Sequence, residues 1–298
     1  MRTGLKQLRD EQFGAFTARQ ALVAYSPAEM RARIDRGEWI RVFYGVYRAV
    51  ESFPSPEMRV EAARLSTGAA CMPACYETAA ELHGFSVLVD AVTHVLGIQK
   101  RRPGGLVVHQ DRVALEELVL VRETLATSPA RTAVDLARTL KRMDAMATLD
   151  AAVRQGVSPD ELAVELLRCR GRRGRRQAIE LIPLADGRAE SPMESRARLR
   201  CIDAGLPAPE PQLEVDTPDG RRRIDLGWRA WRIGLEYDST SWHSGEEAAT
   251  RDRTRHNWLT AQGWTLLHTT ATDVYHHPEH FTEPIRRALR RHPDAVVR

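Results

Sequence analysis

The stretch RRRIDLGWRAWRIGLEYDSTSWHS, residues 221–244, decides the fold of the C-terminal part of this chain. Side chains alternate between the two faces of a β-strand, so a period of two sorts the residues of a strand into two sets. Each apolar run in this stretch predicts a strand that carries acidic side chains on one face only. Apolar residues oppose acids in both runs: Ile224, Leu226 and Trp228 against Asp225, and Ile233, Leu235 and Tyr237 against Glu236 and Asp238.

Few residues separate the two runs, which predicts a β-hairpin that brings Asp225 beside Glu236 and Asp238. Carboxylates gathered in this way repel one another, so a half-buried cluster either raises its pKa values or binds a cation. Oxygen ligands of this kind suit Mg²⁺ or Mn²⁺. An edge hairpin whose polar face meets water would show the same alternation. The pattern alone leaves a metal site and a solvated sheet face equally open.

The composition is that of a globular protein. A length of 298 residues predicts about two or three domains. The formal net charge is +4 and Arg greatly outnumbers Lys, a mild bias toward phosphate or nucleic-acid partners. The four cysteines fit no C-x-x-C zinc pattern and are too few for a secreted disulfide scaffold. Since no apolar run suits a membrane span or a signal peptide, we expect a soluble cytoplasmic protein with no membrane partner.

Residues 1–52 predict a winged helix-turn-helix, in which three short helices precede a small β-hairpin. The hairpin is expected in EWIRVFYGVYRAV, around Gly45, because this run is rich in aromatic and β-branched residues. The expected helices are residues 5–14, residues 18–24 after the cap Thr17, and a helix that is capped by Ser26 and ends at Gly37.

The third of these helices is basic, and in a winged helix it enters the major groove while the hairpin contacts the DNA backbone. The segment TARQAL, followed by a capped helix ending in RGEWIRVFYGVYRA, resembles the N-terminal domain of the AbiEi-type antitoxin and transcriptional regulator family. The resemblance implies contact with double-stranded DNA. We expect base contacts from Arg31 and Arg33, and backbone contacts from Arg36, Arg41 and Arg48. A solvated basic helix on a small structural domain is the alternative.

Residues 56–187 predict an α+β middle domain. Helices are expected over residues 57–66 and 76–82 and after the cap Ser128, with strands in VTHVLGI, GLVVHQ and LVLVRET. The run SPARTAVDLA resembles the second part of AbiEi-like proteins. We expect a scaffold and a candidate surface for a protein partner. Three scattered histidines are expected to be packed or at the surface: His83, His94 and His109. RGRRGRR, residues 170–176, is expected to be a solvated helix start or a linker rather than a phosphate-binding segment.

Residues 188–298 predict a third domain of the order helix, three strands, helix, strand, helix, which is α/β with a mixed sheet. SPMESRARLRCIDAGL opens it as a helix capped by Ser191, with Pro192 at the first helical position and Glu194 at the capping-box position. The later elements are expected in QLEVDT, in the hairpin, over residues 246–262, in WTLLHTT and over residues 282–291.

The ordered motifs SPMES, RIDLGW, GLEYDSTSWH, RDRTRHN and GWTLLHTTATDV resemble the PD-(D/E)xK nuclease superfamily. The specific resemblance is to the uncharacterised domain family related to the very-short-patch mismatch repair endonuclease. It implies a restriction-endonuclease-like mixed sheet flanked by helices, in which Asp225 and Glu236 hold Mg²⁺ or Mn²⁺. An acid from the preceding helix often joins them in that superfamily, which would be Glu194. A capping box alone would also explain Glu194.

The usual lysine of the superfamily, two residues beyond the second acid, is replaced by Asp238. Very-short-patch-type enzymes use instead a histidine in a Trp-His pair, which Trp242 and His243 match. The resemblance implies that His243 accepts a proton from the nucleophile or polarises a metal-bound water, and that Asp238 is a further metal ligand or orients His243. Arginines on the next helix would neutralise phosphate charge: Arg251, Arg253 and Arg255. Three later histidines are expected at the surface rather than in a second metal site: His276, His277 and His280.

Two functions follow from these expectations. The first is a Mg²⁺-dependent DNA endonuclease of DNA repair or defence, recruited to duplex DNA by the winged helix. The second is a non-catalytic DNA-binding transcriptional regulator or type IV antitoxin-like protein that retains a nuclease fold. The missing lysine keeps the second function open, because a fold does not determine an activity.

Overall fold

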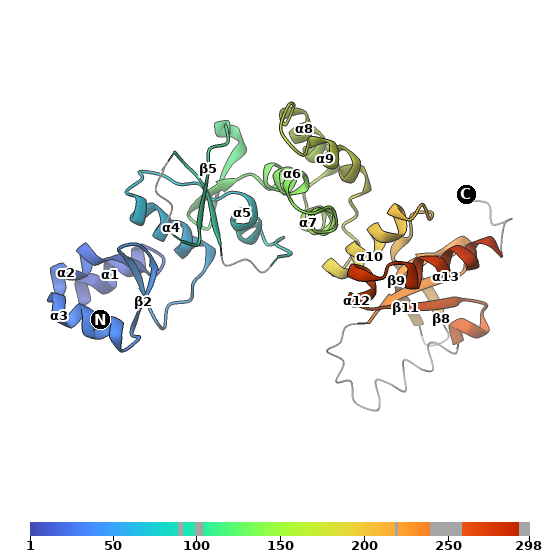
Figure 1. Cartoon of the computed structure of the whole chain (residues 1–298), viewed down its shortest axis with the longest axis horizontal. Coiled ribbons are helices and arrows are strands. Elements are labelled where there is room, and N and C mark those ends of the chain that lie inside the picture. Colours follow the sequence, from blue (N-terminus) through green and yellow to red (C-terminus); the bar gives the residue numbers. More distant parts are fainter. Residues whose placement is uncertain (89–91, 99–103, 218–219, 239–257, 292–298) are drawn as a thin grey trace. The chain divides into compact units, whose positions relative to one another are not determined.

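The computed structural model describes residues 1–88, 92–98, 104–217, 220–238 and 258–291 (Figure 1). By its internal contacts the chain forms two compact units, and each is described by itself. One unit comprises Met1–Leu136 with Asp160–Arg170, and the other Ala137–Pro159 with Gly171–Arg298. The three domains expected from the sequence, 1–52, 56–187 and 188–298, stay a prediction. Within the residues described, no helix has the length and apolar character needed to cross a membrane.

The first unit begins with the winged helix-turn-helix. Its elements are α1 (Thr3–Glu11), β1 (Ala15–Thr17), α2 (Ala18–Ala24), α3 (Pro27–Asp35), β2 (Trp39–Phe43) and β3 (Val46–Ala49). Thr17 and Ser26 form the capping boxes of α2 and α3, as their sequences predict. The sequence pattern missed β1, which is only three residues long and pairs with β3 in a sheet of order β1-β3-β2. This confirms the winged helix.

The rest of the first unit is α+β, as expected, except that one predicted strand is a hairpin. Its elements are α4 (Pro56–Thr67), α5 (Tyr76–His83), β4 (Thr93–Leu96), β5 (Leu106–His109), β6 (Leu118–Val121), β7 (Thr124–Thr127), α6 (Pro129–Thr139) and α8 (Pro159–Arg168). LVLVRET divides at Arg122 and Glu123, whose φ angles of 44° and 65° make a tight turn between β6 and β7. Neither is a residue that favours positive φ, so the turn carried no sequence signal.

A buried arginine anchors α6. The Arg131 side chain is 1% exposed, and it donates from Nε to Asp135 Oδ2 at 2.7 Å and from Nη1 to Glu117 Oε1 at 2.8 Å. Glu165 of α8 lies 3.9 Å from the same guanidinium. Burial, and then the neighbouring Glu117, raise the pKa of Glu165 to about 7. The SPARTAVDLA run is therefore the centre of a buried ion network.

The second unit contains a four-stranded mixed sheet of order β11-β10-β9-β8, in which only β10 and β11 are parallel among the described pairs. This confirms the predicted α/β class. Its elements are α7 (Arg142–Arg154), α9 (Arg175–Leu181), α10 (Pro192–Asp203), β8 (Glu210–Thr217), β9 (Gly220–Trp228), β10 (Ile233–Tyr237), β11 (Thr265–Thr269), α12 (Ala271–His276) and α13 (Glu279–Arg290). Residues of α10, α12 and α13 pack in one apolar core with β9 and β10 (Figure 1).

The last two helices of the second unit differ from the expected C-terminal elements. Thr270 caps a short helix, α12, that was not predicted, and α13 begins at Glu279 rather than at residue 282. α13 also contains Pro284 in its interior. The sequence signal was weak because α12 is six residues long and histidine-rich at its end.

Buried ion pairs fix α10 against α7. Arg198 donates from Nη2 to both oxygens of Asp150, at 2.8 and 2.9 Å, and the two side chains are 5% and 0% exposed. Arg196 pairs with Asp144 at 2.9 Å. Removing one member of a buried pair leaves an uncompensated charge, so these contacts hold α10 firmly in one position. The same helix carries Glu194.

Candidate active site

Glu194 is held at the first turn of α10 by its own carboxylate. Ser191 Oγ caps the helix by accepting from the Glu194 backbone N–H at 3.2 Å. Glu194 Oε2 accepts from the backbone N–H of Glu190 at 2.9 Å and from Gln212 Nε2 at 2.8 Å. A capping box also requires the Glu194 carboxylate to accept from the Ser191 backbone N–H. The structure, which describes both residues, shows no such hydrogen bond, so the expected capping box is wrong. The carboxylate turns toward the sheet instead.

Burial and the nearby charge of Asp225 both raise the pKa of the Glu194 carboxyl. Glu194 is 7% exposed. Burial raises its pKa, and the negative charge of Asp225 adds to the increase, although hydrogen bonds from Glu190, Gln212 and Ser191 oppose it. Asp225 therefore lies near enough to Glu194 for its charge to raise the pKa of that carboxyl, by a smaller effect than burial.

Asp225 lies where β9 and β10 stop pairing. The ladder between these strands runs from Ile233–Trp228 to Leu235–Leu226. One step further along this register, Asp225 comes opposite Glu236. There the Asp225 carboxylate, rather than a backbone carbonyl, accepts the Tyr237 N–H at 2.8 Å. Glu236 is 9% exposed. The predicted hairpin therefore brings these acids to adjacent positions.

Asp238 meets a histidine that the sequence analysis did not select. His268 of β11 is the register partner of Glu236 across the parallel pair. Its Nδ1 lies 3.2 Å from Asp238 Oδ1, and the Asp238 N–H donates to Thr269 O at 2.8 Å. A polar residue inside the apolar run WTLLHTT was the available signal. The role of Asp238 as a metal ligand stays a prediction.

Gln212 is a second missed residue, and it completes a polar row across the sheet. Its neighbours Pro211 and Leu213 pair with Leu226 and Ile224, which places Gln212 beside Asp225. Gln212 has a φ of 51°, unusual for glutamine in a strand. Successive strands thus carry polar residues in the order Gln212, Asp225, Glu236 and His268. A local sequence pattern gave no indication of Gln212.

The strict alternation expected for β9 is wrong at one position. Ile224 belongs to a core with Leu213 and Leu259, whereas Leu226 and Trp228 belong to the core with α10 and α13. The change occurs at Asp225, beside the left-handed Gln212. A twist at this point directs side chains of one strand into two different cores.

Two parts of the expected site lie outside the described residues. These are His243 with its neighbour Trp242, and the helix arginines Arg251, Arg253 and Arg255. Their assignments remain predictions.

The donor set suits a hard divalent ion. Asp225 is half-buried, Glu236 is buried, and both offer carboxylate oxygens at the end of the β9–β10 ladder. Across the described stretches, Asp225, Glu236 and Asp238 do not form a trio with ligand atoms within 4.8 Å of one another. Mg²⁺ commonly takes about one or two protein carboxylates and completes its shell with water and phosphate oxygens. A site built on Asp225 and Glu236 therefore fits Mg²⁺ or Mn²⁺ without a third acid.

The structure separates the arginines expected to contact DNA into two groups. Arg31 and Arg41 are exposed, and Arg36 is exposed while it pairs with Glu38 at 2.7 Å. Arg33 instead lies over the rings of Tyr25 and Trp39 at 4.9 and 5.6 Å. Arg48 donates to three carbonyls at and just after the end of β3: Ala49, Val50 and Ser52. Arg33 and Arg48 thus have internal contacts that a DNA contact would have to replace.

The middle histidines are packed, as expected, but two of them are not scattered. His94 Nδ1 and His109 Nε2 lie 2.9 Å apart on the paired strands β4 and β5. One hydrogen therefore lies between the rings. His83 Nε2 lies 2.8 Å from Thr127 O, and burial lowers the pKa of His83. These contacts show that the three side chains pack within the first unit.

Two family models match this chain, one in its middle part and one in its C-terminal part. Residues 68–184 match the family described as AbiEi antitoxin C-terminal domain, and residues 207–289 match the restriction endonuclease-like family REase_MTES_1575. The uncharacterized proteins MT2308 and Rv2248, from two strains of Mycobacterium tuberculosis, are each 42% identical to this chain over 267 residues. Each alignment covers 88% of this chain and 97% of the relative. The chain therefore belongs to the family of these mycobacterial proteins, and it joins an AbiEi-like domain to a restriction endonuclease-like domain.

Proposed function

We propose that the protein is a Mg²⁺- or Mn²⁺-dependent endonuclease that hydrolyses phosphodiester bonds of double-stranded DNA, in repair or defence. The observation that carries the proposal is the position of Asp225 opposite Glu236 where β9 and β10 stop pairing, with Glu194 close enough for Asp225 to raise its pKa. A purely solvated hairpin face would not need a buried acid on the adjoining helix.

Each residue of the site has a distinct part in this proposal. Asp225 and Glu236 hold the ion, which when bound polarises the scissile phosphate and lowers the pKa of water. Glu194 stays in place through the Glu190 and Gln212 hydrogen bonds and keeps Gln212 beside Asp225. His268 orients Asp238 through their 3.2 Å contact. His243 remains the proposed proton acceptor.

Recruitment to DNA is assigned to the winged helix. Arg31 and Arg36 are exposed on or just after α3, and Arg41 is exposed on β2. Tyr44, at the turn between β2 and β3, is 77% exposed. Arg41 lies 5.6 Å from the Tyr44 ring. This surface has the charge and shape to bind a phosphate backbone.

The test is cleavage of supercoiled and linear duplex DNA by the full chain with Mg²⁺ or Mn²⁺. We expect Asp225→Asn and Glu236→Gln to reduce cleavage to background. Asp216→Asn is the matched control, because Asp216 is an exposed acid of the same sheet that pairs with Arg221. Activity that survives both site substitutions would exclude this site.

A non-catalytic regulator or type IV antitoxin-like protein is the second candidate. The AbiEi match over residues 68–184 and the Asp238 in place of lysine favour it. It predicts gel-shift binding of duplex DNA that needs no divalent ion, and no cleavage of DNA or RNA by the wild-type chain. A protein partner for residues 68–184 would then be sought by co-purification with the products of adjacent genes.

A further inference from the structure

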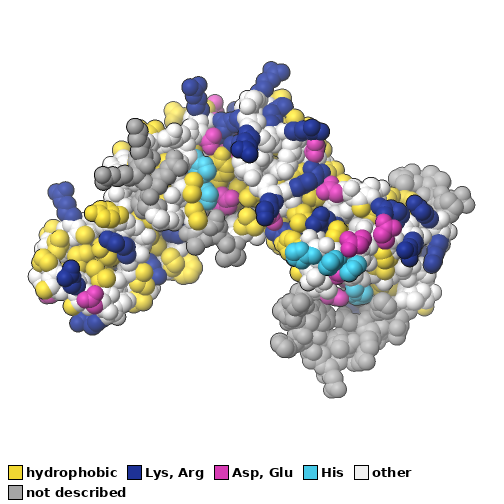
Figure 2. Space-filling model, in the orientation of Figure 1, with side chains coloured by type: hydrophobic (Ala, Val, Ile, Leu, Met, Phe, Trp, Pro, Cys, Tyr) yellow, Lys and Arg dark blue, Asp and Glu magenta, His cyan; other side chains and the backbone are white. Residues whose placement is uncertain are grey.

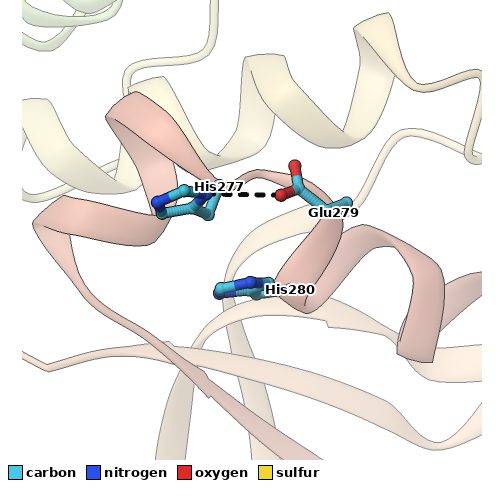
Figure 3. Close-up of side chains that lie close together, drawn as sticks. All are labelled: His277, Glu279 and His280. Atoms are coloured by element: carbon cyan, nitrogen blue, oxygen red, sulfur yellow. Dashed lines mark ion pairs between the residues drawn. The ribbon is translucent and has the colours of Figure 1, made fainter.

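Two histidines and one glutamate come together at the turn between α12 and α13. His277, Glu279 and His280 each offer a ligand atom, and these atoms all lie within 4.8 Å of one another (Figure 3). His277 Nδ1 is 3.4 Å from Glu279 Oε1. The two imidazole rings are nearly parallel, with centroids 4.9 Å apart. Histidine side chains gather on the surface of the second unit (Figure 2).

The backbone holds the three side chains in a short, ordered turn. The His277 N–H donates to Asp273 O at 3.0 Å and ends α12. Pro278, with a φ of −59°, follows, and the His280 N–H donates to His277 O at 2.9 Å. Since the three side chains lie within residues 277–280, where α12 ends and α13 begins, little backbone conformational entropy is lost when an ion binds.

A carboxylate behind His280 is the second, independent indication of a ligand. His280 Nδ1 lies 3.0 Å from Asp273 Oδ1. Asp273 is itself fixed, because its Oδ2 accepts from the Thr270 N–H at 3.0 Å and from Thr270 Oγ1 at 2.7 Å. Metal-binding histidines usually donate one ring N–H to such a carboxylate, which orients the other nitrogen toward the ion. Because Nδ1 of His280 faces Asp273, Nε2 would be the nitrogen that binds an ion.

Ion pairing alone does not explain the group. His277 and Glu279 are 51% and 58% exposed, and an exposed pair of this kind contributes little to stability.

We propose that His277, Glu279 and His280 bind a divalent transition-metal ion of the zinc class, with water in the remaining coordination position. Two imidazole nitrogens and one carboxylate oxygen suit Zn²⁺, whereas Mg²⁺ prefers oxygen ligands alone. The site is separate from Asp225 and Glu236 and differs from them in ligand chemistry. Its ion links α12 to α13 and stabilises the end of the restriction endonuclease-like domain.

The experiment is a Zn²⁺ titration of the metal-free full chain against a chromophoric chelator. We expect His277→Asn and His280→Asn each to weaken Zn²⁺ binding at least about tenfold, and Asp273→Asn to weaken it about 10- to 100-fold. His276→Asn is the matched control, because His276 is an exposed histidine adjacent to the set but outside it. Asp225→Asn should also keep the wild-type Zn²⁺ affinity, whether or not the chain cleaves DNA.

Circular dichroism verifies that each variant is folded, and Co²⁺ absorption reports a nitrogen and oxygen ligand set. The proposal is overturned if the wild-type chain shows no Zn²⁺ affinity. It is also overturned if His276→Asn weakens binding as much as His280→Asn does, or if Asp225→Asn abolishes binding.

Discussion

Gln212 of β8 donates a 2.8 Å hydrogen bond from Nε2 to Glu194 of α10, and this bond joins the sheet to the helix beside Asp225. The glutamine adopts a φ of 51° at that position. Strain of this kind persists where surrounding contacts require it, and it is common at functional sites. The relationship makes Gln212 the residue that positions Glu194 relative to the strand acids.

Shortening Gln212 should reduce DNA cleavage through the position of Glu194 rather than through a loss of fold stability. Gln212→Asn keeps an amide and tolerates the left-handed backbone, but its Nδ2 falls short of Glu194. We expect DNA cleavage to fall about 10- to 100-fold. Gln177→Asn is the control, since Gln177 donates hydrogen bonds from Nε2 to Ala137 O and Leu140 O at 2.8 and 2.9 Å elsewhere in the unit. Equal loss of cleavage in both variants would mean that Gln212 acts only through stability.

The Glu165 carboxyl should make stability depend on pH. Burial first, and then Glu117, raise its folded-state pKa to about 7, from a reference value of 4.5. A carboxyl whose pKa is raised by folding stabilises the fold below about pH 4.5, and this contribution is lost as pH rises through about 7, by up to about 3 kcal/mol. The pKa of Glu117 is lowered, so its own contribution has the opposite sign.

Urea unfolding at pH 5 and pH 8 measures this effect. Glu165→Gln keeps a donor toward Glu117 and does not ionise, so it should match the wild type at pH 5 and be more stable at pH 8. The exposed Glu161→Gln on the same helix is the control. Identical pH dependence in the wild type and Glu165→Gln would contradict the prediction.

Breaking the buried pair between α7 and α10 should destabilise the second unit. Arg198→Met leaves Asp150, which is 0% exposed, without its 2.8 Å partner, at a cost of about 3–5 kcal/mol. The double variant Arg198→Met/Asp150→Leu should recover most of this loss, because no uncompensated charge remains. Thermal unfolding of the three proteins measures the effect, and a double variant no better than the single one would refute the electrostatic cause.

A methyl group at Gly234 should overpack the sheet. Its Cβ would lie 2.7 Å from Leu266 Cδ2 and 2.9 Å from Ile224 Cγ2. We expect Gly234→Ala to destabilise the unit by about 1–3 kcal/mol. Adding Leu266→Ala makes room, so Gly234→Ala should cost less in that background than in the wild type. Chemical denaturation of the four proteins forms a double-mutant cycle, and strict additivity would argue against the clash.

The winged-helix arginines should differ in the salt dependence of DNA binding. Arg41→Ala should weaken binding of all duplexes and reduce the slope of log K against log salt by about 0.9, because Arg41 is the expected backbone contact. Arg31→Ala should weaken binding of the preferred sequence most, because Arg31 is the expected base contact. Arg33→Ala should mainly lower stability, because Arg33 lies over Tyr25 and Trp39. Arg176→Ala is the control, because Arg176 lies in RGRRGRR, outside the winged helix, and its side chain is 94% exposed. An unchanged slope in Arg41→Ala together with unchanged affinity in Arg31→Ala would exclude this surface.

Local chemistry by itself determined much of the fold. Caps such as Thr17 and Ser26 act within a few residues, so the starts of α2 and α3 were predictable from the chain alone. The two-residue period of the hairpin likewise predicted Asp225 and Glu236 as neighbours. Both signals are short-range, and no distant residue needs to be known to recognise them.

Only the tertiary structure decided which residues join those acids. Gln212 and His268 enter the polar row because β8 pairs with β9 and β11 pairs with β10, and no local pattern encodes the register between distant strands. Glu194 departs from its capping box for the same reason, since its partner Gln212 is 18 residues away. The sequence determined the acids of the site, and the packing of α10 on the sheet determined their surroundings.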